Sequence, residues 1–198
     1  MKLYDLDLSG NCYKVRLFAA LSGMPLELVN VDVMGGEHKR GPFLELNPFG
    51  QIPVLDDGGH VVRDSQAILV YLANRHGDEQ WWPADAAGQA EIVGWLAVAA
   101  HEVRVGPADA RMVDKFGMDL DKPTTEAASA ALLPLLDAHF SKHDWAALDR
   151  PTIADCALFP YLALAHEGGI DVTPHGALCR WMARVQALPG YVGMPGIR

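Results

Sequence analysis

The sequence predicts a small α/β domain followed by an all-α domain, and three observations support this division. Short β-prone runs alternate with helical patterns over residues 1–76. Strand signals stop after Trp81-Trp82-Pro83, where alanine becomes more frequent. Beyond Pro83, apolar residues recur at helical spacing. We therefore expect an α/β unit over 1–76, a linker over 77–87 and a helical unit over 88–198.

The first unit reads as β-α-β-α-β-β-α. The segments with strand character are 2–6, 26–31 and 52–55, and a further strand begins at Val61. A helix is expected over 12–22 because Gly23 and Pro25 stop it. A short helix or loop follows Gly35-Gly36 and runs through Leu46.

Residues 56–59 read Asp-Asp-Gly-Gly between apolar runs, which is typical of a hairpin turn. Ser65 is expected to be the N-cap of the helix that follows, in which Ile68 and Leu72 share a face. Gly77 ends that helix.

The second unit contains several helical patterns. Its first helix has apolar residues at i, i+3, i+4, i+7 and i+11, namely Ile92, Trp95, Leu96, Ala99 and Val103. Gly106-Pro107 is expected to interrupt it, and further helices are expected over 126–140 and 178–188. Thr152 and Asp155 form a capping-box pattern at the start of another helix.

The charge and composition exclude several classes of protein. The 198 residues carry 16 Lys and Arg against 25 Asp and Glu, a formal charge of −9, which argues against nucleic-acid binding. A small, locally positive pocket for an anion remains compatible with this charge. Because no apolar stretch reaches about 18 residues, we expect no membrane span.

Localisation is predicted from the N-terminus and the cysteines. Acidic residues stand where a signal peptide would carry its apolar run. The three cysteines, Cys12, Cys156 and Cys179, form no even framework, so free thiols in a reducing cytoplasm are expected. His139 and His143 are spaced i, i+4, but no third ligand accompanies them, and we expect no metal site.

The turn Ser9-Gly10-Asn11-Cys12 is the first candidate for chemistry. It lies where a predicted strand gives way to a helix, and the unpaired amides and dipole of a helix N-terminus stabilise an anion such as a thiolate. Ser9 and Cys12 have the spacing of a redox Cys-x-x-Cys motif in which a hydroxyl replaces the first thiol. A hydroxyl cannot form a disulfide, but it can donate a hydrogen bond to another molecule's sulfur. Alternatively, Ser9 is only an N-cap and Cys12 a small buried apolar residue.

Four segments together carry a family resemblance. They are residues 9–16 (SGNCYKVR), 47–55 (NPFGQIPVL), 64–72 (DSQAILVYL) and 150–155 (RPTIAD). With these segments in this order and spacing, the chain resembles the cytosolic glutathione transferase family over nearly its whole length. Among the members of that family it is most similar to the bacterial, theta-like ones. The resemblance implies the glutathione transferase fold, in which a thioredoxin-like α/β domain precedes the all-α domain.

The resemblance also implies how glutathione would be held. Gln51 would hold its backbone or glycyl end, and Ile52, before a cis Pro53, would pair main chain to main chain with its cysteinyl part. His38, with Lys39, would meet the glycine carboxylate.

The other end of the tripeptide would meet Asp64 and Ser65, which would hold the γ-glutamyl ammonium and carboxylate. Ser9 matches the serine that stabilises the thiolate in theta-like members. Related groups use a Cys or an Asn near this turn, so Asn11 and Cys12 are also candidate catalytic residues.

The second substrate would lie in an apolar pocket between the two domains. The candidate wall residues are Leu6, Leu8, Val105, Met112 and Phe116, which read equally well as plain core. The resemblance implies a cytoplasmic, detoxifying homodimer that transfers an unidentified hydrophobic electrophile to glutathione. It implies no cofactor beyond glutathione as co-substrate.

Two other functions fit the same pattern. A glutathione-dependent peroxidase or disulfide reductase could use the same glutathione-binding residues, with Cys12 taking part in redox chemistry. A non-catalytic binding module could share the fold, but it would leave the polar set Gln51, Asp64 and Ser65 without a purpose.

Overall fold

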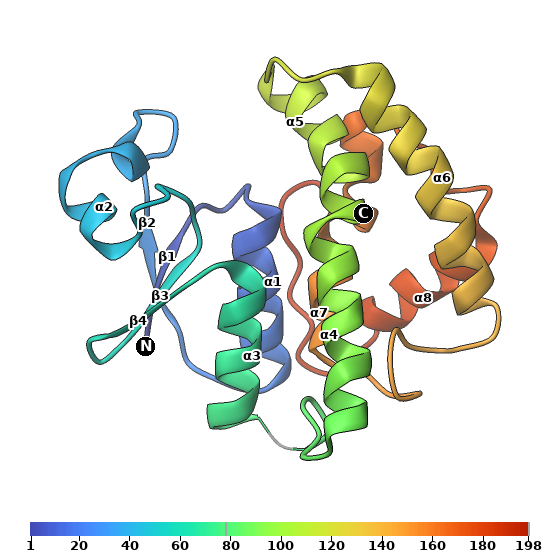
Figure 1. Ribbon diagram of the computed structural model, residues 1–198, viewed down its shortest axis with the longest axis horizontal. Coiled ribbons are helices and arrows are strands. Elements are labelled where there is room, and N and C mark those ends of the chain that lie inside the picture. Colours follow the sequence, from blue (N-terminus) through green and yellow to red (C-terminus); the bar gives the residue numbers. More distant parts are fainter. Residues whose placement is uncertain (78, 198) are drawn as a thin grey trace.

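The structure is a computed structural model and describes residues 1–77 and 79–197. Figure 1 shows a sheet at one end of the molecule and a group of helices at the other. Helices α1 (Gly10–Leu21) and α3 (Ser65–His76) lie between them and contact α7 (Ile153–Ala163) of the helical group. The predicted fold class, a thioredoxin-like α/β part followed by an all-α part, is confirmed.

The N-terminal part has the predicted order of elements. Besides α1 and α3, it consists of β1 (Lys2–Asp5), β2 (Glu27–Asn30), a 3-10 turn (Glu37–Lys39), α2 (Gly41–Leu46), β3 (Val54–Asp57) and β4 (His60–Arg63). The strands form one sheet in the order β2-β1-β3-β4. β2 runs parallel to β1, whereas β3 is antiparallel to both of its neighbours.

Side-chain alternation along the strands explains why the sheet is covered on both faces. Leu3 and Leu55 are paired across β1 and β3 and belong to the main core with α1 and α3. The neighbouring pair, Tyr4 and Val54, points the other way and packs in a second cluster with Phe43 of α2. The sheet therefore holds the ends of α1 and α3 at fixed positions.

The helical part contains five α-helices among the described residues. They are α4 (Ala86–Ala100), α5 (Asp109–Phe116), α6 (Lys122–Phe140), α7 and α8 (Gly176–Gln186), with a 3-10 turn at Ala165–Gly168. The predicted interruption at Gly106-Pro107 is confirmed, because a π-type turn (Arg104–Ala108) has a non-helical ψ of −106° at Gly106. The sequence-based prediction contained no helix at α5, which has only eight residues and follows directly on the interruption at Gly106-Pro107.

The predicted capping box is confirmed at the start of α7. Thr152 caps the helix and accepts from the Ala154 amide at 3.2 Å, and Asp155 Oδ2 accepts from the Thr152 amide at 2.9 Å. Asp155 Oδ1 also accepts from the Ala146 amide at 3.0 Å and from the indole N–H of Trp181 at 2.8 Å. One buried carboxylate thus joins α7, α8 and the segment before α7.

Two further findings concern the described residues as a group. None of their helices combines the length and apolarity that crossing a membrane requires. Their His, Cys, Asp and Glu side chains form no group of three or more that could hold a metal ion.

Candidate active site

Ser9 is the N-cap of α1 and lies half-buried at the end of the β1–α1 loop. Its Oγ accepts a hydrogen bond from the Cys12 amide at 3.2 Å, and its carbonyl oxygen accepts from the Tyr13 amide at 2.9 Å. The same hydroxyl also makes a hydrogen bond with the Cys12 side chain, and its hydrogen is of the kind that can be donated to a sulfur. The α1 dipole adds positive potential at the same place. This turn can therefore stabilise an incoming anion.

Cys12 is fully buried one turn into the same helix. Burial raises the pKa of its thiol to about 12, against a smaller lowering by the hydrogen bond with Ser9. A thiol with such a pKa is almost entirely protonated at neutral pH, and it is sealed from any substrate. The geometry is that of a small packing residue.

Asp64, not Ser65, is the N-cap of α3, which corrects the prediction. Its Oδ1 accepts from the amides of Gln66 at 2.9 Å and Ala67 at 3.2 Å. These two amides are therefore not free to bind a guest carboxylate. The prediction of a Ser65 cap had left them free for that contact. Asp64 is exposed and has a φ of +73°, a strained conformation for a residue other than glycine. The strain turns an exposed carboxylate toward the helix N-terminus.

The two helix N-termini are in contact. Ser65, which is buried, approaches Asn11 of α1, with Oγ 3.5 Å from Asn11 Oδ1. The same hydroxyl makes a shorter hydrogen bond to Gln66. The predicted residues of the α1 turn and the α3 turn therefore lie side by side, although 54 positions separate Asn11 from Ser65 in the sequence.

The loop before β3 is shaped by Asn47, whose role sequence analysis missed. Its Oδ1 accepts from the Phe49 amide at 3.1 Å, and its Nδ2 donates to the Gln51 carbonyl at 2.8 Å. The Ile52–Pro53 peptide bond is cis. The Gln51 side chain is exposed, and no described residue bonds to the Ile52 main chain, which leaves its N–H and C=O to a ligand.

His38 and Lys39 lie against this loop. A Cβ added at Gly50 would come within 2.7 Å of the His38 carbonyl oxygen, and Lys39 Nζ donates to the Phe49 carbonyl at 3.3 Å. His38 Nδ1 is buried and has no partner among the described residues. Burial, with a smaller contribution from Lys39, lowers the pKa of His38, so the imidazole is neutral at pH 7.

Two residues beneath the α1 turn were also missed. Lys14 is buried on α1, with its ammonium 5.5 Å from the ring centroid of Tyr161 on α7. Burial lowers the pKa of Lys14 to about 8, and the Asp64 charge opposes this shift. The Tyr161 ring packs directly under Gly10, where an added Cβ would approach it to 2.8 Å. Only glycine fits at the first position of α1.

Of the residues predicted to line the second-substrate pocket, two contact the same side chain. Leu8, Val105, Met112 and Phe116 are all half-buried. The guanidinium of Arg111 connects two of them, because its Nη1 donates to the Leu8 carbonyl at 3.1 Å and its Cζ lies 5.1 Å from the Phe116 ring centroid. Arg111 had no predicted role, because its partners Leu8 and Glu167 are distant from it in the sequence.

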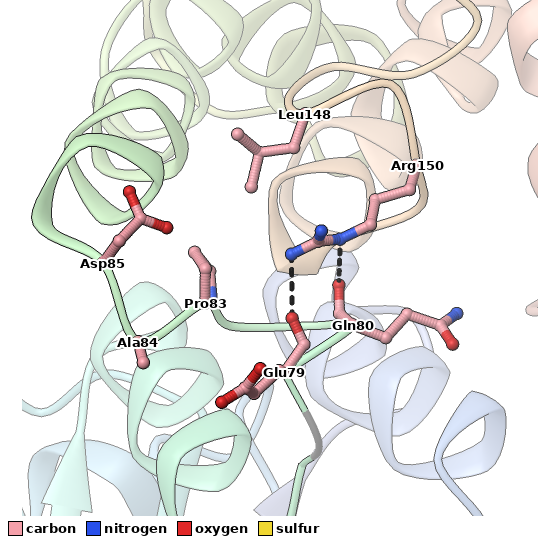
Figure 2. Close-up of a pocket in the computed structure, with 7 residues that line it drawn as sticks. All are labelled: Glu79, Gln80, Pro83, Ala84, Asp85, Leu148 and Arg150. Carbon is pink, nitrogen blue, oxygen red and sulfur yellow. Dashed lines mark hydrogen bonds between the residues drawn. The ribbon is translucent and has the colours of Figure 1, made fainter.

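A separate open cavity of about 750 Å³ lies at the linker, and Figure 2 shows its lining. Arg150 donates there to the carbonyls of Glu79 at 2.8 Å and Gln80 at 2.9 Å, which fastens the linker to the helical part. None of its lining residues is a predicted site residue. The predicted polar residues gather instead around the Ser9 turn, where Asn11 and Ser65 meet.

A thioredoxin-like α/β part in which two helix N-termini meet, followed by an all-α part, defines a two-part class of fold. The family models of the glutathione S-transferase N-terminal and C-terminal domains match residues 3–80 and 112–189. Glutathione S-transferase 3 of Zea mays is 32% identical, over 96% of this chain and 91% of the relative. The chain belongs to the glutathione S-transferase family.

Solved structures agree with this assignment. A glutathione S-transferase from Pseudomonas fluorescens superimposes with a TM-score of 0.90 at 31% identity, over 98% of each chain. A glutathione transferase homologue from Drosophila mojavensis with bound glutathione superimposes with a TM-score of 0.85 at 26% identity, over 95% of this chain and 88% of that one.

Proposed function

We propose that this protein is a glutathione transferase that activates the thiol of glutathione as a thiolate for attack on an electrophilic small molecule. The observation that carries this proposal is the position of the Ser9 hydroxyl at the N-terminus of α1, where it accepts from the Cys12 amide and can donate its hydrogen to a guest sulfur. Hydrogen bonding to the charged form lowers a pKa. Family membership supplies the guest, since the Drosophila mojavensis homologue holds glutathione.

In this proposal the tripeptide extends across a group of residues of the N-terminal part that we call the cradle. They are His38, Lys39, Gln51, Ile52, Asp64 and Ser65. Its cysteinyl main chain pairs with Ile52 as an added strand, and Gln51 holds the backbone toward the glycyl end. Its glycine carboxylate meets Lys39 and His38, whose buried Nδ1 is then given a partner. The sulfur lies at the N-terminus of α1.

Asp64 binds the γ-glutamyl ammonium through its exposed carboxylate, while Ser65 receives the γ-glutamyl carboxylate. Asp64 Oδ2 has no partner among the described residues, because Oδ1 alone caps the helix. The cap and the proposed ligand contact therefore use different oxygens.

Replacing Asp64 with asparagine tests this contact. Asparagine retains the capping oxygen and tolerates a positive φ, so the free energy of unfolding should change by less than about 1 kcal/mol. Loss of the charge should raise the Kd for glutathione about 10-fold or more in calorimetric titration. Asp56→Asn is the control, since Asp56 lies in β3 and its side chain accepts from the Gly59 amide in the turn before β4. An unchanged Kd in Asp64→Asn would reject Asp64 as the ammonium ligand.

The redox alternative depends on Cys12, whose burial makes it a poor nucleophile. We expect Cys12→Ser to keep its transferase activity on a chloronitrobenzene-type acceptor within about threefold, provided that it folds, because removing a group outside the reaction leaves transition-state stabilisation unchanged. Any activity on a hydroperoxide should likewise be unchanged. Selective loss of hydroperoxide activity would instead favour the peroxidase or reductase reading. Failure of the wild-type protein to bind glutathione would favour the binding module.

We also propose a homodimer. At the β4 edge of the sheet, Phe49 and Val61 remain exposed, and the Arg63 guanidinium lies 4.3 Å from the Phe49 ring centroid. Exposed apolar side chains at an unpaired strand edge suit burial against a second copy. Light scattering should give twice the chain mass of 21.5 kDa, and the mass of a single chain would reject the dimer.

A further inference from the structure

The loop that carries Ser9 is held by two arginines from different parts of the chain. Arg16 of α1 donates to the Leu6 carbonyl at 3.4 Å and to the Asp7 carbonyl at 2.8 Å. Arg111 of α5 donates to the next carbonyl, that of Leu8, at 3.1 Å. Three successive carbonyls before Ser9 therefore accept guanidinium N–H groups. Only the last of these contacts comes from the helical part.

Arg111 is itself held in place from the other side. It is 1% exposed, and its Nε donates to Glu167 at 2.6 Å. Lys115 binds the other oxygen of Glu167, so two cations share one carboxylate. The Phe116 ring lies against the guanidinium. These contacts leave Arg111 little freedom, and the Leu8 carbonyl is fixed with it.

Burying the Arg111 guanidinium lowers the stability of the fold, and packing alone does not explain why an arginine stands there. Its Nη2 is buried and has no hydrogen-bond partner among the described residues. A buried donor without an acceptor is destabilising, and apolar residues often replace buried ion pairs without loss of stability. The contact that requires the planar fork is the pair of bonds to Glu167 and Leu8, which lysine cannot reproduce in the same geometry.

We propose that Arg111 is a positioning residue that sets the Ser9 hydroxyl for the thiolate. It acts through the Leu8 carbonyl, one peptide unit before Ser9, and so makes the catalytic turn depend on the helical part. This inference rests on the proposed function.

The test is a double-mutant cycle on the thiol pKa of glutathione bound to the full chain. The pKa is measured by the absorbance of the thiolate as the pH is varied. Arg111→Lys keeps the charge and a contact to Glu167 but loses the fork. We expect it to raise the bound thiol pKa by about half a unit to one unit. We expect it to lower kcat at pH 7 about 1.5- to 3-fold, in proportion to the lost thiolate, and to leave the KM for glutathione nearly unchanged. Arg104→Lys, at an exposed neighbouring arginine, should change neither quantity.

The cycle with Ser9→Ala separates positioning from stability. If Arg111 acts through Ser9, Arg111→Lys should have little further effect on the thiol pKa in the Ser9→Ala background. A folded Arg111→Lys variant with the wild-type thiol pKa and kcat would overturn the inference, even if its melting temperature falls. An equal shift in both backgrounds would also overturn it. If wild-type protein does not lower the thiol pKa at all, the proposed function itself fails.

Discussion

Replacing Ser9 with alanine is expected to lower kcat about 10- to 25-fold at pH 7 and to change the KM for glutathione much less. A thiol of pKa about 8.5 is only ~3% thiolate at pH 7, and lowering its pKa by about two units raises that fraction to ~75%. The variant should lose most of this gain. It should also lose about 1 kcal/mol of stability, because the Cys12 amide loses its cap.

The pH dependence makes this prediction specific. As the pH rises through about 8.5, glutathione ionises without help, so the difference in kcat between the two proteins should shrink and nearly vanish near pH 10. Ser22→Ala is the control, since Ser22 is the C-cap of the same helix and its buried hydroxyl has no partner among the described residues. A Ser9→Ala enzyme with the wild-type kcat at pH 7 would remove Ser9 from the mechanism.

Replacing Asp155 with alanine is expected to cause the largest loss of stability, about 3–5 kcal/mol. The carboxylate accepts from the Ala146 and Thr152 amides and from the Trp181 indole, and all three donors would be left buried without a partner. Urea denaturation would measure the change. Asp144→Ala, which removes an exposed partner of Arg184, should stay within about 1 kcal/mol.

Asp155 also predicts a direction for the pH dependence. Burial, opposed by its hydrogen bonds, raises its pKa from 3.8 to about 6 in the folded protein. The folded state therefore takes up this proton first as the pH falls. The stability that Asp155 contributes is fully present below pH 3.8 and is lost as the pH rises through about 6.

The Asp155→Asn variant removes the titrating carboxyl group, so a comparison with the wild type measures the effect of that group on stability. The stability of the wild type relative to this variant should increase as the pH falls from 7 to 4, with a slope of at most about 1.4 kcal/mol per pH unit. A constant difference over this range would show that Asp155 does not titrate there.

The parts of the fold that depend on neighbouring residues could be predicted from the sequence. The capping box of Thr152 and Asp155 and the interruption at Gly106 were confirmed because each is specified within a few positions. A local prediction that failed was the N-cap of α3, where Asp64 and Ser65 are both good caps and only the backbone conformation distinguishes them.

The missed contacts join residues that are far apart in the sequence. Arg111 reaches Leu8 across 103 positions. In α8, Asp137 Oδ1 of α6 accepts from the Ala177 amide at 2.8 Å, across 40 positions. Local patterns carry no information on such pairs, because the pairs exist only once the helices have packed.

The candidate site divides in the same way. Most of the candidate site residues could be named from three short motifs, and His38 and Lys39 only from the family resemblance, but their grouping depends on the sheet, which brings the α1 and α3 turns together. The support beneath the cradle, from Tyr161 and Arg111, could not be named, since a tyrosine or an arginine within a helix reads as core or surface.

The most direct test of the central claim is the pKa of glutathione's thiol when it is bound to the wild-type protein, measured by ultraviolet absorbance of the thiolate against pH. The account predicts a value about two units below that of free glutathione, and a return most of the way to the free value in Ser9→Ala. A bound thiol that ionises at the same pH as free glutathione would contradict the account.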